Sequence, residues 1–197
     1  MIKKLFFKVK IVFPAILLVV FVFSSTGCKK QSRKAEAKSI VKEWIGKEIK
    51  FPDDFQCNLS GKDTSYMLCA DLLESEFKIL SYVDSTGCTD CKLQLIEWDY
   101  LINELNYVQG DKLSFLFFLH PKDITELQLL IQRNNFQHPV FIDTKNEINL
   151  MNKFAKQSKY HCFLLDKNNK ILVIGNPVQS IEILELYKQQ IGLSDAN

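Results

Sequence analysis

From Phe77 onward, short apolar segments typical of strands alternate with segments whose apolar residues recur at helical spacing. This alternation limits the fold more than any other feature. The run Leu113–Leu119 is almost entirely apolar, which is typical of a central strand covered on both faces. Further strands are expected at Phe77–Val83, Val140–Ile142, Cys162–Leu165 and Ile171–Ile174. Helices are expected at Cys91–Tyr107, Ile124–Asn134, Ile148–Phe154 and Val178–Ile191. This order predicts an α/β fold in which helices flank a central mixed sheet that ends in an antiparallel hairpin.

Polar residues mark where several of these elements begin or turn. Asp123 directly precedes the helix expected at 124–134 and is a candidate N-cap. Asp143 follows the strand at 140–142, where we expect it to cap the next helix. The segment Asp166–Lys170 is rich in residues that tolerate the left-handed region, so it predicts a tight turn between the last two strands.

The segment 35–76 has a different pattern and is interpreted as a β-rich addition. Ala35–Ile45 has the apolar spacing of a short amphipathic helix. Glu48–Leu59 and Thr64–Ala70 are expected to form two irregular strands around a turn at Ser60–Gly61.

Residues 1–27 have the pattern of an export signal, with lysines as their only charged residues. The apolar run Ile11–Phe23 is shorter than the roughly 20 residues that span a bilayer. The small residues Ser24–Gly27 lead to Cys28, and this pattern resembles the lipobox of bacterial lipoproteins. The resemblance implies cleavage before Cys28, a lipid on its thiol, and attachment to the envelope of a Gram-negative bacterium, facing the periplasm. A plain signal peptide or an uncleaved anchor helix is the alternative.

The charge balance excludes one class of function. The whole chain has a net charge of +2. Four of its basic residues lie in the export signal, which has no acidic residue, so the remainder of the chain is slightly acidic. A basic nucleic-acid-binding surface is therefore not expected.

The chain has six cysteines, and the pair Cys88–Cys91 is the candidate reactive centre. The pair lies between an expected strand and an expected helix, at the edge where open α/β sheets carry their sites. A helix N-terminus stabilises a thiolate, so we expect Cys88 to attack and Cys91 to resolve the mixed disulfide. Gly87, Thr89 and Asp90 are the neighbours of this cysteine pair in sequence. The carboxylate of Asp90 disfavours the thiolate form of the pair. This favours a reductant of moderate strength.

Three segments together resemble the thioredoxin-like superfamily, in particular its envelope-anchored thiol–disulfide oxidoreductase lipoproteins of Bacteroidetes type. They are Tyr82–Asp84, Cys88–Lys92 and the hairpin Phe163–Ile171. The resemblance covers 77–191 and implies a thioredoxin-like fold, exchange with the thiols and disulfides of exported proteins, a redox partner, and no cofactor. The expected organisation is an export signal at 1–27, a lipidated cysteine and tether at 28–34, the addition at 35–76 and a thioredoxin-like domain at 77–197.

The sequence departs from that family at three places. Gly87 stands where a Trp is usual before the pair, and Tyr82 stands where thioredoxins keep a buried acid. His161 stands where the family has its cis-proline, followed by Cys162. Because a cis bond before a residue other than proline costs about 2.5–4 kcal/mol, we expect a trans peptide there.

Two alternatives follow from these cysteines. His161 and Cys162 could join the cysteine pair in a Zn or Cu(I) site. The alternatives without a metal are a surface or loop histidine for His161 and a buried strand thiol for Cys162. The domain could also be a binding module that uses the pair as a structural disulfide. Cys57 and Cys69 are candidates for a further disulfide in the N-terminal addition.

Overall fold

The computed structural model describes residues 34–53, 57–59, 62–63, 71–86 and 93–193. It divides the chain into two units, Met1–Glu43 and Trp44–Asn197. In the first unit, residues 34–43 are helical, in agreement with the helix predicted there. Among the described residues, no helix combines the length and the apolar character that a membrane span requires.

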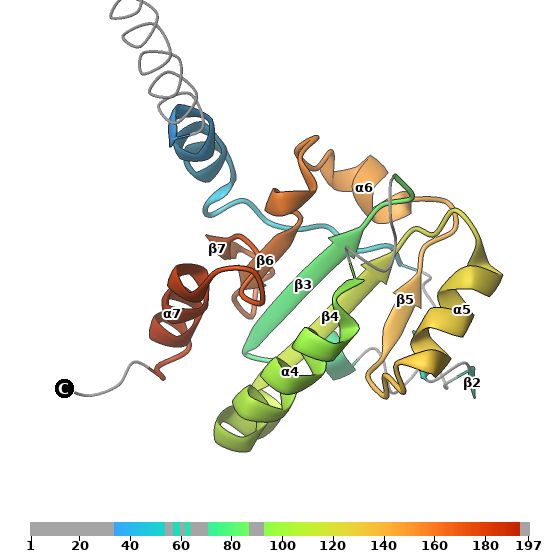
Figure 1. The fold of residues 1–197 in the computed structure, drawn as a ribbon. Coiled ribbons are helices and arrows are strands. Elements are labelled where there is room, and N and C mark those ends of the chain that lie inside the picture. The colour runs from blue at the N-terminus through green and yellow to red at the C-terminus, as the bar shows by residue number, and fades with distance from the viewer. Residues whose placement is uncertain (1–33, 54–56, 60–61, 64–70, 87–92, 194–197) are drawn as a thin grey trace, which may run out of the picture. The chain divides into compact units, whose positions relative to one another are not determined.

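The second unit is built on a mixed sheet whose described part has seven strands in the order β2-β1-β5-β4-β3-β6-β7 (Figure 1). Strands β3, β4 and β5 are parallel, whereas β6 runs antiparallel to β3, and β7 runs antiparallel to β6. The short hairpin β1–β2 pairs antiparallel with the edge of β5. The strands are β1 Cys57–Leu59, β2 Lys62–Asp63, β3 Phe77–Val83, β4 Leu113–Leu119, β5 Val140–Ile142, β6 Cys162–Leu165 and β7 Ile171–Ile174.

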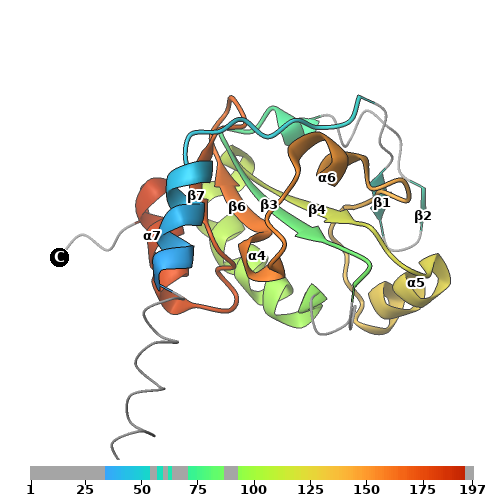
Figure 2. The ribbon, with the colours of Figure 1, turned by 90° about the horizontal axis from the view of Figure 1, so that it is seen from above.

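Helices cover both faces of this sheet (Figure 2). Three of them, α4, α5 and α7, pack on one face, and α6 lies on the other together with Trp44 and the extended stretch 47–53. The helices are α4 Leu95–Gln109, α5 Ile124–Arg133, α6 Glu147–Asn152 and α7 Ile181–Gln190, with single 3₁₀ turns η1 Asp71–Leu73, η2 Gly110–Lys112 and η3 Ser158–Tyr160.

The two faces of the central strands supply two apolar layers, because successive side chains of a strand point to opposite sides. On the α4 side, Ile79 and Phe117 pack with Trp98 of α4. On the other side, aromatic side chains contact one another, as Phe154 does with Phe163 and Tyr82. Each fully buried large side chain contributes roughly 1.5–3 kcal/mol, so both layers hold the sheet.

The strands from β3 onward begin and end where the sequence predicts them. The predicted caps are also confirmed. The side chain of Asp123 accepts hydrogen bonds from the backbone N–H groups of Thr125 and Glu126. Asp143 accepts from those of Glu147 and Ile148.

Several boundaries differ from the prediction. Helix α4 runs from Leu95, and Gln94, in a left-handed conformation, separates it from Leu93, which is also helical. The predicted beginning at Cys91 lies outside the described residues. Helix α7 begins at Ile181 rather than at Val178, because Ser180 caps it by accepting from the N–H of Ile183. In the N-terminal addition, β2 lies at Lys62–Asp63, directly after the predicted turn; the predicted strand 64–70 lies outside the described residues.

One charged residue lies within the layer that faces α6. The side chain of Lys78 in β3 is 0% exposed, and its Nζ donates to the carbonyls of Leu73, Ser75 and Lys167 at 3.0–3.2 Å. Burial lowers the pKa of Lys78, although the charges of Asp166 and Glu74 oppose this. The ammonium group therefore ties the turn between β6 and β7 to the segment that leads into β3.

Candidate active site

The candidate site lies at the carboxyl end of β3. Asp84 follows the strand directly, and its Oδ1 accepts from the backbone N–H and the hydroxyl of Thr86 at 3.0 and 2.7 Å. This arrangement is an Asx turn, which ends the strand and turns the chain toward α4. The predicted residues Gly87, Cys88, Thr89, Asp90 and Cys91 come next in sequence and lie outside the described residues, as do Cys28 and Cys69. Their roles remain predictions.

Gln94 joins the beginning of α4 to the loop between β7 and α7. Its backbone is left-handed, with φ 46° and ψ 46°. Its side-chain Oε1 accepts from the amide of Gln179 at 2.5 Å and from that of Asn176 at 3.4 Å. Sequence reasoning did not single out these three residues, because isolated amides without a motif carry no signal of such a contact.

His161 lies in the loop between η3 and β6, as one interpretation has it, but it is 5% exposed, so it is not a surface histidine. Its carbonyl accepts from the N–H of Tyr82 at 2.9 Å, beside the pairing of β3 with β6. Its ring lies 5.1 Å from the ring of Tyr82 and 6.0 Å from that of Phe154. The Nε2 lies 2.6 Å from the carbonyl oxygen of Ala155, which assigns the proton to Nε2. The described residues contain no cis peptide bond.

Cys162 lies on the opposite face of the sheet, in the core beneath α4 and α7. Its Sγ is 3.6 Å from the hydroxyl of Tyr187, which donates to the carbonyl of Gly175 at 2.9 Å. Burial raises the pKa of the Cys162 thiol to about 12, so the sulfur stays protonated at neutral pH. The interpretation as a buried strand thiol is confirmed.

The structure therefore separates two residues that the metal alternative needs together. The ring of His161 packs with Tyr82 on one face, and the thiol of Cys162 contacts Tyr187 on the other. Within the described residues, no three His, Cys, Asp or Glu side chains are grouped as metal ligands. A site that combines His161 and Cys162 does not fit this geometry.

Tyr82 occupies the position where the family has a buried acid. Its hydroxyl donates to Oδ1 of Asn146 at 2.7 Å. The pKa of Tyr82 is raised, first by burial and then by the charges of Asp84 and Asp143. The phenol therefore stays neutral and cannot act as the ionisable acid that it replaces.

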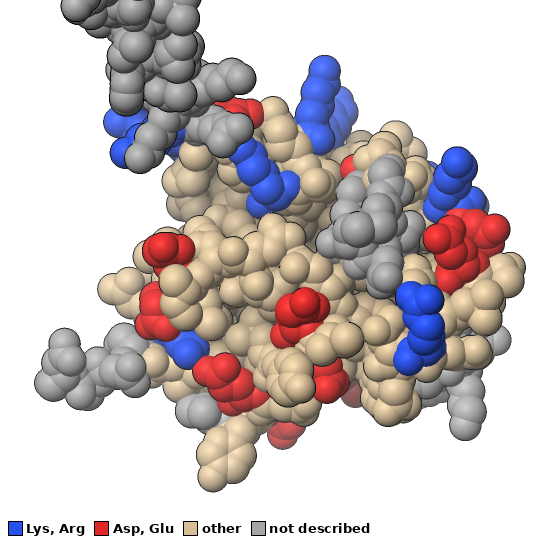
Figure 3. Space-filling model, viewed as in Figure 1, with Lys and Arg blue, Asp and Glu red and all other residues tan. Residues whose placement is uncertain are grey.

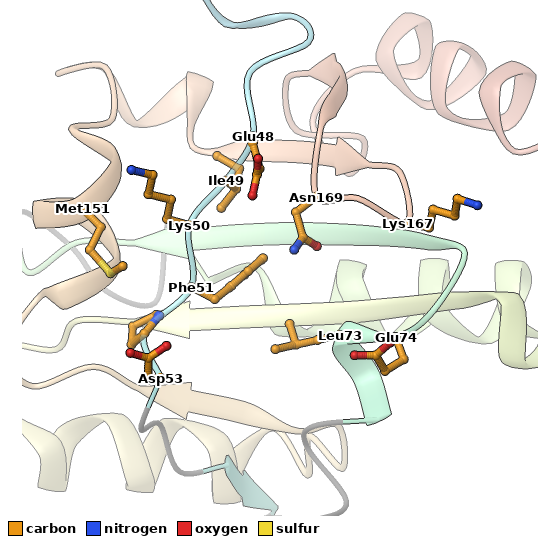
Figure 4. Close-up of a pocket in the computed structure, with 11 residues that line it drawn as sticks. Glu48, Ile49, Lys50, Phe51, Asp53, Leu73, Glu74, Met151, Lys167 and Asn169 are labelled. Carbon is orange, nitrogen blue, oxygen red and sulfur yellow. The ribbon is translucent and has the colours of Figure 1, made fainter.

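A small hollow of about 100 Å³ opens beside these groups. Tyr82 and His161 line it, together with Lys159, Asn176 and Gln179. A larger cavity, of about 560 Å³, lies at the other end of β3 (Figure 4). It is enclosed by the stretch 48–53, by Leu73 and Glu74, and by the turn between β6 and β7. Its described lining contains no cysteine or histidine.

Comparisons with known proteins bear on the fold. No protein-family model and no curated protein matches the sequence. A proposed thiol:disulfide interchange protein DsbE from Chlorobium tepidum is similar in structure, with a TM-score of 0.55 and 14% identity over 75% of this chain and 98% of that one. A proposed thiol-disulfide oxidoreductase from Bacteroides vulgatus has a TM-score of 0.53 and 16% identity, over 74% and 93% of the two chains. A proposed protein disulfide isomerase from Bacteroides thetaiotaomicron has a TM-score of 0.52 and 16% identity, over 76% and 93%.

At 14–16% sequence identity, the similarity of this chain to these structures concerns the fold alone. The shared features are a mixed sheet flanked by helices and a terminal antiparallel hairpin, which the sequence analysis also predicted. The chain therefore has the thioredoxin-like fold, and its structural neighbours are thiol–disulfide oxidoreductases.

Proposed function

We propose that this protein exchanges thiols and disulfides with exported proteins through Cys88 and Cys91. The observation that carries the proposal is the place of the pair in the sequence. In a chain with the thioredoxin-like fold, it lies between the end of β3 at Val83 and the beginning of α4 at Leu95. The carboxyl ends of such strands are where α/β sheets carry their reactive groups.

The chemistry in the reducing direction takes two steps. The thiolate of Cys88 attacks one sulfur of a client disulfide, so that a Cys88–client disulfide forms and the other client sulfur leaves as a thiolate that takes up a proton. Cys91 then loses its proton and attacks Cys88, which releases the second client thiol and leaves a Cys88–Cys91 disulfide. The client gains two electrons and the pair loses two, and a reduced redox partner must restore the dithiol.

His161 and Tyr82 act on this site by position rather than by ionising. The backbone of His161 is fixed through its bond to Tyr82, and its ring is fixed on Ala155. The fixed loop around His161 takes the place of the family's proline loop, and it supports the surface on which a client binds. A carboxylate beside a thiol disfavours the thiolate, so Asp90, beside the pair in sequence, favours reduction of clients over their oxidation.

Kinetics with glutathione disulfide test the proposal. In the reduced full-length protein, Cys91→Ser should accumulate a mixed disulfide between Cys88 and glutathione, because the resolving thiol is missing. Cys88→Ser should react at least tenfold more slowly than the unsubstituted protein. Cys162→Ala is the matched control and should keep the original rate, since its thiol is buried. If Cys88→Ser reacts at the original rate, the proposal is wrong.

We further propose that Cys28 carries a lipid that holds the domain at the envelope, facing the periplasm. The proposal is supported by the lysines, the short apolar run and the small residues that precede Cys28. Several acyl chains give lasting attachment, since each buried CH₂ adds about 0.8 kcal/mol. Cells fed a labelled fatty acid should label the protein but not its Cys28→Ser variant, and equal labelling of both would contradict the anchor.

A further inference from the structure

A groove between α4 and α7 has a volume of about 440 Å³. We call it the α4–α7 groove. Its walls include Glu97, Tyr100 and Glu104 from α4, and Val178, Ile181 and Leu184 from the loop before α7 and from α7 itself. None of these residues has a part in the exchange chemistry proposed above.

The groove borders the hollow beside His161, because Gln179 lines both of them. The same Gln179 donates to Gln94, the residue directly before α4. A peptide bound along Gln179 therefore contacts both the hollow and the α4–α7 groove.

Large apolar side chains are exposed on both sides of this groove. Tyr100 of α4 is 75% exposed and Ile181 of α7 is 64% exposed. An exposed tyrosine beside an aliphatic side chain is typical of a surface that binds another chain, because a rigid ring buries much area with little loss of entropy.

The charge on this surface is acidic. Figure 3 shows Asp and Glu side chains over α4 and α7, whereas many of the lysines lie along the upper edge in that view. Glu97 and Glu104 line the groove itself. The carboxylate of Glu104 is already paired, since the Nζ of Lys188 lies 2.9 Å from Glu104 and 3.9 Å from Glu185, so the attraction for a basic ligand rests on Glu97.

The length of the groove limits what it holds. Glu97 and Glu104 are two helical turns apart, which is roughly 10 Å along α4. An extended peptide advances about 3.3 Å per residue, so the groove accepts about three residues.

We propose that the α4–α7 groove binds the client segment next to its reacting cysteine, and that it selects segments with apolar residues and a lysine or arginine. The inference rests on the proposed exchange function and names its substrate class. Apolar client side chains cover Tyr100 and Ile181, and the basic side chain pairs with Glu97.

Two synthetic peptides test this, each with one cysteine joined to glutathione as a mixed disulfide. In the first, leucine, lysine and leucine stand on both sides of the cysteine; in the second, glutamate replaces each lysine. We expect the reduced full-length protein to release glutathione from the lysine peptide with a kcat/KM about fivefold or more above that for the glutamate peptide. Equal values for the two peptides would overturn the inference.

Variants locate the selection in the groove. Glu97→Gln should lower the preference for the lysine peptide by about half or more. Tyr100→Ala should raise KM for both peptides and leave the ratio of their kcat/KM values unchanged. Glu126→Gln, on the exposed side of α5, is the matched control and should keep the full preference. A loss of preference in Glu126→Gln as large as that in Glu97→Gln would assign the effect to the overall charge and overturn the inference.

Glutathione disulfide separates this inference from the function on which it rests. A protein that reduces glutathione disulfide but treats both peptides alike keeps the proposed function and lacks the selective groove. A protein that reduces neither glutathione disulfide nor the peptides lacks the proposed function, and the groove then has no such substrate.

Discussion

The imidazole of His161 donates its Nε2 hydrogen to the carbonyl oxygen of Ala155 over 2.6 Å, and this contact fastens the loop between α6 and β6 to the edge of the sheet. The loop is also held by Phe154, which packs on Tyr82 and Phe163. Where the family has a proline at this edge, this chain has a buried side chain that holds the loop by a hydrogen bond.

Replacing this side chain should destabilise the fold. His161→Ala removes a buried ring and leaves the carbonyl of Ala155 without its donor, so we expect the free energy of unfolding to fall by about 2 kcal/mol or more. Urea unfolding followed by circular dichroism measures this. His138→Ala is the control: His138 makes a partly exposed contact with Asp99, worth about 0.2–1 kcal/mol. Equal losses in the two variants would contradict the role of His161.

Lys78 should be a second stabilising residue, because its ammonium group holds three carbonyls inside the protein. Lys78→Met keeps most of the volume but leaves those oxygens without a donor. We expect a loss of about 2–4 kcal/mol in urea unfolding. The exposed Lys167→Met should change stability by less than about 0.5 kcal/mol. A Lys78→Met variant as stable as the unsubstituted protein would show that the three bonds contribute nothing net.

Cys162 should be unreactive in the folded protein. Its thiol is buried and its pKa is raised to about 12, so at neutral pH almost no thiolate is present. Iodoacetamide at pH 8 should leave Cys162 unmodified in native protein and modify it in urea, as measured by mass spectrometry of its peptide. Modification in native protein at the rate seen in urea would contradict this burial.

The same groups predict a loss of stability in alkaline solution. The pKa of Cys162 rises from an ordinary 9.0 to about 12 on folding because of burial, and burial also raises that of Tyr187. The folded state therefore keeps protons that the unfolded state releases, so stability is full below pH 9 and falls as the pH rises toward 12. Urea unfolding at pH 8, 9 and 10 should show this decrease. The double variant Cys162→Ala, Tyr187→Phe should show a smaller decrease, and an equal one would contradict the assignment.

Periodicity and polar caps predicted the fold because they are local. The apolar run Leu113–Leu119 could only be a covered central strand, and Asp123 could be recognised as a cap from its place before an apolar helix. The left-handed residue Gln94 before α4 could not be predicted, because its contacts with Asn176 and Gln179 are far away in sequence.

The candidate site was less accessible to sequence reasoning. The alternation of side chains across a strand separates His161 from Cys162, but this depends on where β6 begins, and a shift of one residue would exchange their faces. That His161 is buried follows from aromatic neighbours contributed by β3 and by the loop after α6, which no local pattern reveals.

A redox titration of Cys88 and Cys91 tests the central claim most directly. The full-length protein in detergent would be equilibrated in thiol–disulfide buffers of known potential, alkylated, and its modified cysteines counted by mass spectrometry. The account predicts that the two residues titrate together as one two-electron couple between about −120 and −270 mV, the range of known exchange proteins. A pair that stays oxidised below about −300 mV would be a structural disulfide and would contradict the proposed function.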